Sequence, residues 1–399
     1  MKAFLTAGHL WRHRSGQTRW RLLWLTLLIA MGVWVFLRYF PSKTEPPIGW
    51  RRLPNLPVGV MAAAVSQVDN LVVISGGITQ LGLTTNLIQV YDLHAGSWRE
   101  PPQLLNTARA MHAQVTLADG RILIVGGERH AVPRRDSRMA EAELFDPQTG
   151  KSVLLPSRLQ PAGRPTAHSL PNGQVIVVGG SVATLFDPVE LKWSGSIQLR
   201  RPRSGHSSLM IETDKVLVGG GQHQRSFELI NVRKMHSRLL SAKLPHPTDD
   251  LELLRLNDHR VWVIGGQNTR TGDTTDQTWI LDLGHAKEAT ITNGSRLGIE
   301  SGVADHCLVV FRDEALILGG ESQRDGHDTA LAEVRRLNLR TLEVSGLPPM
   351  QQAHDDAVAV GVGHGVIVFG GTYDDESLFG RRLPIASRRV EQFVRLSLP

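Results

Sequence analysis

The chain has 399 residues, of which 41% are hydrophobic, 21% are charged and 39 are glycine. This composition is typical of a globular protein rich in turns, and it excludes a disordered or fibrous chain. The formal net charge is +6, but much of the excess lies near the N-terminus and no basic helix or aromatic-interleaved stripe follows, so no nucleic-acid partner is expected.

The first predicted element is a membrane-spanning helix over residues 22–40. Residues 22–37 carry no charge and lie between Arg21 and Arg38. As a helix this run measures about 24 Å against a hydrocarbon core of about 30 Å, and Tyr39 and Phe40 extend it. A cleaved signal peptide and a buried core helix are the alternatives. The segment from Val35 to Phe40 has no small residues for cleavage, which favours an uncleaved anchor.

The charges around this span predict its orientation. Basic residues precede it, whereas the Pro-rich linker 41–49 has mixed charge, so the tail 1–21 is expected in the cytoplasm and residues 50–399 outside it. The arginine-rich composition favours the periplasmic side of a bacterial inner membrane. The basic residues concerned are Lys2, Arg12, Arg14, Arg19 and Arg21.

Residues 50–399 contain one pattern seven times: a short apolar run that ends on a glycine pair. The first glycines are 50, 53, 40, 46, 54 and 51 residues apart, a period typical of a propeller or solenoid. Such apolar runs are typical of strands buried on both faces. The runs are Leu71–Gly77, Ile122–Gly127, Val175–Gly180, Val216–Gly220, Val261–Gly266, Ala315–Gly320 and Val366–Gly371.

A second strand follows most glycine pairs and ends in an Asp or Asn turn, as in Tyr91-Asp92 and Phe145-Asp146, and Trp98 or Trp193 follows on an outer strand. Strand, Gly-Gly, loop, aromatic-Asp and Trp together resemble the kelch repeat. The resemblance covers residues 50–399, although the later repeats lack the outer Trp. It implies an all-β fold, a seven-bladed kelch-type β-propeller, and the uncharged run 22–40 adds one N-terminal transmembrane helix before it.

The two ends of the repeat region predict ring closure. The seventh repeat stops without a fourth strand, whereas Trp50–Pro54 precedes the first repeat and has no blade of its own. We expect this segment to pair near Val390–Leu396, which removes both open sheet edges.

The loops after the glycine pairs and the links between blades emerge on one face, so the residues that open each repeat are candidate ligand-binding residues. Repeats two to four are basic there and repeats five to seven acidic, which predicts a funnel with opposed positive and negative walls. Such a funnel suits a zwitterionic or polyhydroxylated ligand, or a divalent cation on its acidic side. The candidates are Arg109, His112, Arg164, His168, Arg203, His206, Asp249, Asp250, Asp305, His306, His354, Asp355 and Asp356.

The alternative for each Arg and His is a structural position that bonds neighbouring backbone. Kelch propellers most commonly present a loop-built surface to a ligand, so the resemblance implies binding of a protein or glycan ligand at the loop face. Catalysis without metal, as in kelch propellers resembling sugar epimerases, remains open.

Kelch copper oxidases resembling galactose oxidase need a cysteine crosslinked to tyrosine, a second tyrosine and two histidines. Here Cys307 stands beside His306, but the propeller contains only Tyr91 and Tyr373. The lone cysteine, which excludes an intrachain disulfide, is predicted to be a buried strand residue. We therefore predict no metal site and no cofactor.

Overall fold

The computed structural model describes residues 49–130, 137–156, 163–284, 288–324, 326–363, 365–375 and 383–394. The chain divides into two units, residues 1–48 and 49–399, and the second forms the propeller. The predicted tail, membrane span and residues 41–48 of the linker lie outside the described residues. Within the described ranges, no helix is long and apolar enough to cross a membrane.

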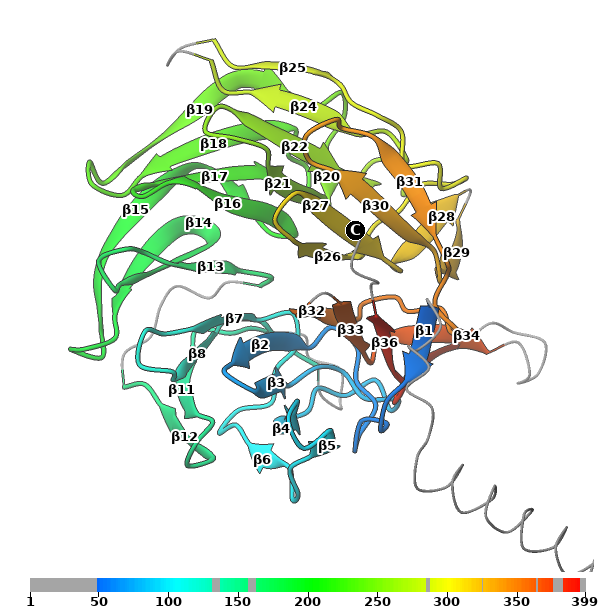
Figure 1. Ribbon diagram of the computed structural model, residues 1–399. Coiled ribbons are helices and arrows are strands. Elements are labelled where there is room, and N and C mark those ends of the chain that lie inside the picture. The colour runs from blue at the N-terminus through cyan, green and yellow to red at the C-terminus, as the bar shows by residue number, and fades with distance from the viewer. Residues whose placement is uncertain are drawn as a thin grey trace, which may run out of the picture. The chain divides into compact units, whose positions relative to one another are not determined.

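Seven antiparallel sheets follow one another around a central axis (Figure 1). The first three blades are β2 (Ala64–Val68), β3 (Leu71–Ser75), β4 (Leu87–Asp92) and β5 (Ser97–Trp98), with β6 (Gln103–Leu104) beside β4; β7 (Ala113–Thr116), β8 (Ile122–Val125), β11 (Ala142–Asp146) and β12 (Lys151–Leu154); and β13 (Thr166–Ser169), β14 (Val175–Asp187) and β15 (Lys192–Arg203).

The next three are β16 (His206–Glu212), β17 (Lys215–Gly220), β18 (Ser226–Asn231) and β19 (His236–Lys243); β21 (Glu252–Arg255), β22 (Arg260–Ile264), β24 (Trp279–Asp282) and β25 (Thr290–Asn293); and β26 (Cys307–Val310), β27 (Glu314–Leu318), β30 (Val334–Asn338) and β31 (Val344–Leu347). The seventh is β32 (Val358–Val362), β33 (Gly365–Phe369), β36 (Val390–Val394) and β1 (Gly49–Arg52). Short loop-face pairs are β9 (Glu128–Arg129) with β10 (Ser137–Arg138), β20 (Thr248–Asp249) with β23 (Gln267–Asn268), β28 (Glu321–Arg324) with β29 (His327–Ala330), and β34 (Thr372–Asp375) with β35 (Leu383–Ala386).

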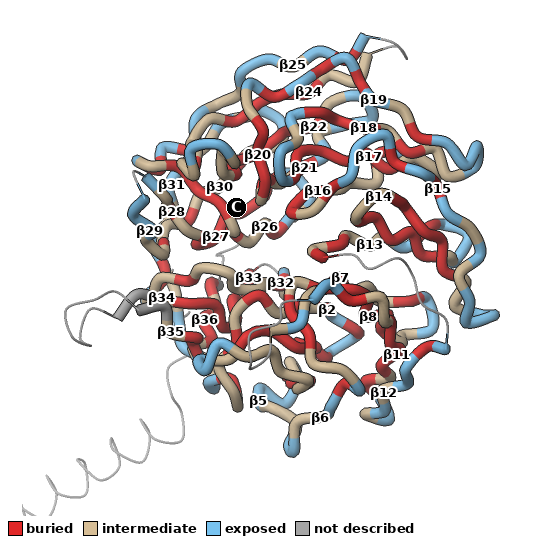
Figure 2. Tube along the Cα trace, turned by 180° about the vertical axis from the view of Figure 1, so that it is seen from behind, coloured by how far each residue is buried: buried red, intermediate tan, exposed pale blue. Residues whose placement is uncertain are grey.

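The apolar runs are the second strands of the blades, and their alternate side chains pack on opposite neighbours. In β8, Ile122 and Ile124 belong to the core shared with the first blade, whereas Leu123 and Val125 belong to the core shared with the third. All four side chains are fully buried, as the predicted sandwiching requires (Figure 2).

The glycine pairs form the turn after the second strand. Gly127 has φ of 93°, and a Cβ there would lie 2.5 Å from the carbonyl oxygen of Ala110, so both conformation and space require glycine. In the fourth blade the left-handed pair is Gly220–Gly221, one residue later than the predicted Gly219–Gly220. In the third blade only Gly180 is left-handed, and β14 continues through it.

The kelch aromatic positions also appear as predicted. The ring centroids of Tyr91 and Trp98 are 5.0 Å apart, and those of Phe186 and Trp193 are 5.1 Å apart. The outer tryptophans therefore cover the third strands.

The predicted ring closure is confirmed by the pairing of β1 with β36. Gly49–Arg52 lie opposite Glu391–Val394 in antiparallel register. The Trp50 and Phe393 rings pack at 5.3 Å, and Trp50 Nε1 donates to the Pro348 carbonyl at 2.9 Å. The first described strand thus becomes the outer strand of the last blade.

Candidate functional site

Seven residues, one from each blade, surround the mouth of the central channel on the loop face. Each stands just before or near the start of its blade's innermost strand, and each has φ between 48° and 64°. All seven line one cavity of about 250 Å³. We call this set the mouth ring; its members are Ala62, Met111, Arg164, Gly205, Asp250, Asp305 and Asp356.

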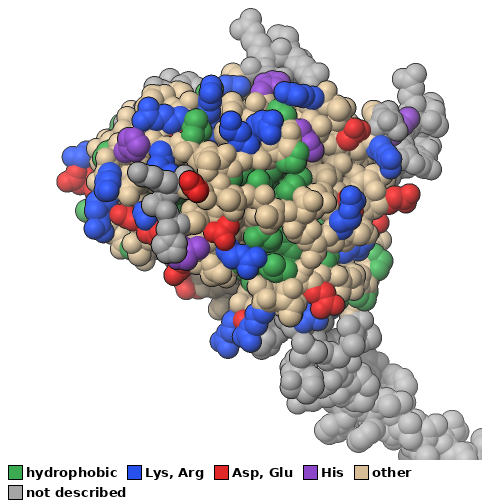
Figure 3. Space-filling view, turned by 90° about the horizontal axis from the view of Figure 1, so that it is seen from above, with side chains coloured by type: hydrophobic (Ala, Val, Ile, Leu, Met, Phe, Trp, Pro, Cys, Tyr) green, Lys and Arg blue, Asp and Glu red, His purple; other side chains and the backbone are tan. Residues whose placement is uncertain are grey.

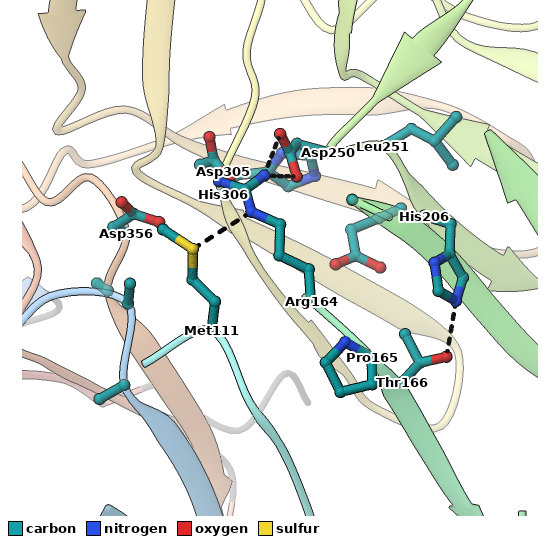
Figure 4. A pocket seen from close by; sticks show the side chains of 15 residues that line it. Met111, Arg164, Pro165, Thr166, His206, Asp250, Leu251, Asp305, His306 and Asp356 are labelled. Atoms are coloured by element: carbon teal, nitrogen blue, oxygen red, sulfur yellow. Dashed lines mark hydrogen bonds and ion pairs between the residues drawn. The ribbon is translucent and has the colours of Figure 1, made fainter. Parts of the chain in front are cut away.

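Backbone hydrogen bonds link members of the mouth ring across blade boundaries. Ala62 N donates to Asp356 O at 2.9 Å, Met111 N to Ala62 O at 2.9 Å, and Asp250 N to Gly205 O at 3.0 Å. A left-handed conformation costs a non-glycine residue about 1 kcal/mol or more, least for Asp. Local strain is therefore concentrated at the cavity, where it aims these side chains inward (Figure 4).

Arg164 is the cationic member of the mouth ring. Its Nη1 lies 2.8 and 2.9 Å from the two carboxylate oxygens of Asp250, two blades away, and its Nε lies 3.4 Å from Met111 Sδ. Burial disfavours the guanidinium charge, but Asp250, Asp305 and Asp356 outweigh burial and raise the pKa of Arg164.

The carboxyl groups of the mouth ring have pKa values above their usual range. Burial raises the pKa of Asp250 and of Asp356, and Arg164 opposes the shift in both. Burial raises the pKa of Asp305 well above its usual value, and the charges of Asp250 and Asp356 add to the increase. Glu252 also lines the cavity, and burial raises its pKa to about 7, against a hydrogen bond from Ser207. Part of this cluster therefore keeps its protons at neutral pH.

A second layer of acids stands behind the mouth ring and does not line the cavity. Burial and Asp250 raise the pKa of Asp249 to about 6. Burial, Asp356 and Glu321 raise the pKa of Asp355 to about 8, and Thr372 Oγ1 donates to Asp355 at 3.2 Å. At neutral pH Asp249 is therefore mostly ionised, whereas Asp355 mostly keeps its proton.

Four predicted histidines lie in the innermost strands or directly before them. His112 Nε2 is 2.8 Å from Ser75 Oγ, His206 Nε2 is 3.2 Å from Thr166 Oγ1, and His168 Nε2 is 2.6 Å from Ser208 Oγ. His306 lines the cavity with His206, and its ring nitrogens have no hydrogen-bond partner among the described residues. Burial lowers the pKa of all four, to about 3 or 4, so they are neutral at physiological pH.

Three predicted residues occupy buried positions inside the blades. Arg109, Arg203 and His354 donate to glycine-pair carbonyls: to Gly126 at 3.0 Å, Gly220 at 2.7 Å and Gly370 at 2.7 Å, respectively. Each also faces a buried glutamate on the third strand of the blade that follows it in the chain, namely Glu143, Glu228 or Glu391. For these three residues the structural alternative holds, and none lines the cavity.

Only part of the predicted basic wall reaches the cavity. Of the three arginines in the expected basic wall, only Arg164 reaches the cavity, and four carboxyl groups share the lining with it. On the outer side of the propeller, which Figure 3 shows after a 90° turn from Figure 1, basic and acidic side chains are interspersed.

The structure brings together six of the predicted residues in the cavity: Arg164, His206, Asp250, Asp305, His306 and Asp356. His112, His168, Asp249 and Asp355 lie outside its lining. The sequence analysis missed Met111, Thr166 and Glu252. Their positions in the repeats could have identified them. Met111 belongs to the mouth ring, and Thr166 and Glu252 each lie two residues after a ring member.

The described residues contain no group of three or more His, Cys, Asp or Glu that could hold a metal ion. Cys307 Sγ donates to the Ala357 carbonyl at 3.2 Å, and burial raises the thiol pKa to about 12. Tyr91 is buried against Trp98, away from this cysteine's strand. These residues do not form the copper site considered above.

The fold and site define a closed seven-bladed β-propeller with an acidic cavity at the mouth of its channel. No protein-family model matches the chain. It is 29% identical over 148 residues to Kelch-like protein terF of Aspergillus terreus, covering 35% of this chain and 30% of that protein. It is 28% identical over 218 residues to Adagio-like protein 1 of Oryza sativa subsp. japonica, covering 47% and 35%, respectively. The matches thus span about a third of these curated relatives.

Among solved structures, a fungal alcohol oxidase of the AA5 family in complex with copper superposes with a TM-score of 0.64 at 16% identity, covering 86% of this chain and 75% of that one. YjhT superposes with a TM-score of 0.53 at 13% identity, covering 84% and 95%. These structural likenesses show the fold alone. The curated matches and the seven repeats identify the chain as a kelch-repeat β-propeller.

Proposed function

We propose that this protein binds a glycan or protein ligand through the mouth cavity, and that the group entering the cavity is an ammonium or a hydroxyl cluster. One observation carries the proposal: Asp250, Asp305 and Asp356, from three successive blades, meet a single arginine in a cavity of about 250 Å³. A cavity of this size admits one sugar residue or one amino-acid side chain.

Hydrogen-bonding capacity supports a donor-rich ligand. Asp250 is engaged by Arg164, but no described residue donates a hydrogen bond to the carboxyl groups of Asp305 or Asp356. Carboxyl groups held in such surroundings bind ammonium and hydroxyl groups well, because these groups supply the missing donors. An anionic group is disfavoured, since four carboxyl groups surround one guanidinium.

The test uses the full-length protein in nanodiscs of neutral lipid. Calorimetric titration with glucose, galactose, glucosamine and a lysine-containing peptide should identify at least one ligand. The double variant Asp305→Asn/Asp356→Asn should weaken its binding at least about tenfold, the loss expected when two hydrogen bonds to the ligand are removed. The matched control is Asp258→Asn/Asp313→Asn, which changes two exposed acids in turns on the face opposite the mouth cavity. Equal affinity for both double variants would refute the proposal.

Catalysis without a metal is the second candidate, and the clustered carboxyl groups with raised pKa favour it. Neighbouring acids held at different protonation states are typical of acid–base sites. A sugar-epimerising or mutarotating activity predicts solvent deuterium at a ring carbon, or faster anomer exchange, by NMR. A ligand that binds and shows neither leaves simple binding as the function.

We propose in addition that residues 22–40 anchor the protein and that the propeller lies on the periplasmic side of a bacterial inner membrane. The uncharged run and the preceding basic tail support this placement.

A further inference from the structure

A second, larger cavity of about 820 Å³ opens on the loop face between the seventh and first blades. Its lining includes three arginines, and no carboxylate is among the described residues that form it. This is the reverse of the mouth cavity, where four carboxyl groups meet one arginine. We call it the basic groove; the side chains that matter here are Arg52, Gln352, Tyr373, Arg388 and Arg389.

The arginines reach the groove from two segments of the closed ring. Arg52 ends β1, whereas Arg388 and Arg389 precede β36, so ring closure itself assembles the site. Arg52 and Arg388 are exposed, and no carboxylate of the described residues lies within ion-pair distance of either. Arg389 lies 3.5 Å from the buried Glu391, which anchors that side chain at the groove wall.

Part of the groove is rigidly built. Arg388 Nε donates to the Leu56 carbonyl at 2.7 Å, and Ser387 Oγ donates to Gln352 at 3.0 Å. Gly59 allows this segment to lie close: a Cβ there would stand 2.7 Å from the Ala386 carbonyl oxygen and 3.1 Å from Arg388 Cγ. The guanidinium is therefore held in place before any ligand arrives, which lowers the cost of ordering it on binding.

We propose that the basic groove binds an acidic saccharide, whose carboxylate or sulfate groups pair with Arg52 and Arg388. Guanidinium groups match the planar, bidentate geometry of these anions. The surrounding amide and hydroxyl side chains, which include Asn55, Thr79, Gln352 and Tyr373, supply partners for sugar hydroxyls. The inference rests on the proposed function, because it makes the ligand a glycan that extends beyond the mouth cavity.

The test measures binding of hexagalacturonate to the full-length protein in neutral-lipid nanodiscs, with maltohexaose and hexaglutamate as comparison probes. We expect hexagalacturonate to bind most tightly and its affinity to fall with salt, since the arginines are exposed. Arg52→Gln/Arg388→Gln should weaken it about tenfold and flatten the salt dependence. Arg233→Gln/Arg312→Gln, exposed arginines in turns on the opposite face, should not.

Equal binding of maltohexaose, or unchanged affinity in Arg52→Gln/Arg388→Gln, overturns the proposal. If hexaglutamate binds as tightly as hexagalacturonate, the ligand is not specifically a saccharide, and the groove is assigned to an acidic peptide. Titration of the same double variant with glucosamine and the hexoses separates the two sites. If this variant loses hexagalacturonate binding but still binds the mouth-cavity ligand, the result supports an acidic-saccharide site in the groove that is separate from the mouth cavity. Absence of hexagalacturonate binding with the mouth-cavity ligand still bound refutes the groove and leaves the proposed function standing.

Discussion

Replacing Glu252 by Gln should stabilise the protein at alkaline pH. Burial raises the Glu252 pKa from 4.5 to about 7, against the hydrogen bond from Ser207, and Asp250 adds to the increase. A raised carboxyl pKa means that the unfolded chain ionises first, so the folded state loses stability as pH rises from 4.5 through 7. At about 1.4 kcal/mol per unit the loss is about 3 kcal/mol, and the half-buried side chain reduces it to about 2 kcal/mol.

Gln keeps the acceptor for Ser207 Oγ, which lies 3.1 Å from Glu252. Calorimetric melting should therefore show a Tm gain of about 2–4 °C at pH 8 that shrinks to under about 1 °C at pH 5. Glu212→Gln, an exposed acid at the end of β16, is the control and should change Tm little at either pH. An equal gain at both pH values, or a loss at pH 8, would contradict a buried, ionisable Glu252.

Three further outcomes are expected. Arg109→Ala should lower the free energy of unfolding by about 3–5 kcal/mol, because it leaves the buried Glu143 carboxylate without its cationic partner. Arg164→Ala should lower the free energy of unfolding much less and should weaken ligand binding. Similar losses for both variants in urea unfolding would contradict the division between a structural Arg109 and a ligand-binding Arg164. Trp50→Ala should cost about 2 kcal/mol through the lost Phe393 contact, and an unchanged Tm would argue against ring closure by β1. A reporter that works only outside the cytoplasm should be active when fused after Pro399, and substitution of the tail arginines by Glu should impair it; activity of a cytoplasm-only reporter there would reverse the assignment. The tail arginines are Arg12, Arg14, Arg19 and Arg21.

The sequence predicted the blades well because their signals are local. Each apolar run and glycine pair lies within about seven residues, and the strand–turn register follows from it. The fourth blade shows the limit: three successive glycines, Gly219 to Gly221, leave the position of the turn undetermined by sequence, and packing selects the last two.

The candidate site was predicted only in part, because partners far apart in the chain decide which side chains reach the cavity. Arg109 and Arg164 look alike in sequence, yet Arg109 lies two residues before the mouth ring and turns inward to Glu143, 34 residues away. Arg164 is itself in the ring and pairs with Asp250, 86 residues away. The distance to the following histidine, three residues from Arg109 and four from Arg164, was the available sign of this difference.

Closure by β1 has a mechanical consequence. Successive strands of a blade alternate in direction, so β1 enters from the face opposite the mouth and carries Arg52 to the loop face. A force that pulls on Gly49 along the strand direction would shear β1 against β36. Resistance then comes from the four residue pairs between Gly49–Arg52 and Glu391–Val394 together, with the Trp50–Phe393 contact among them, so the strand that completes the ring also sets how much force the closed ring withstands.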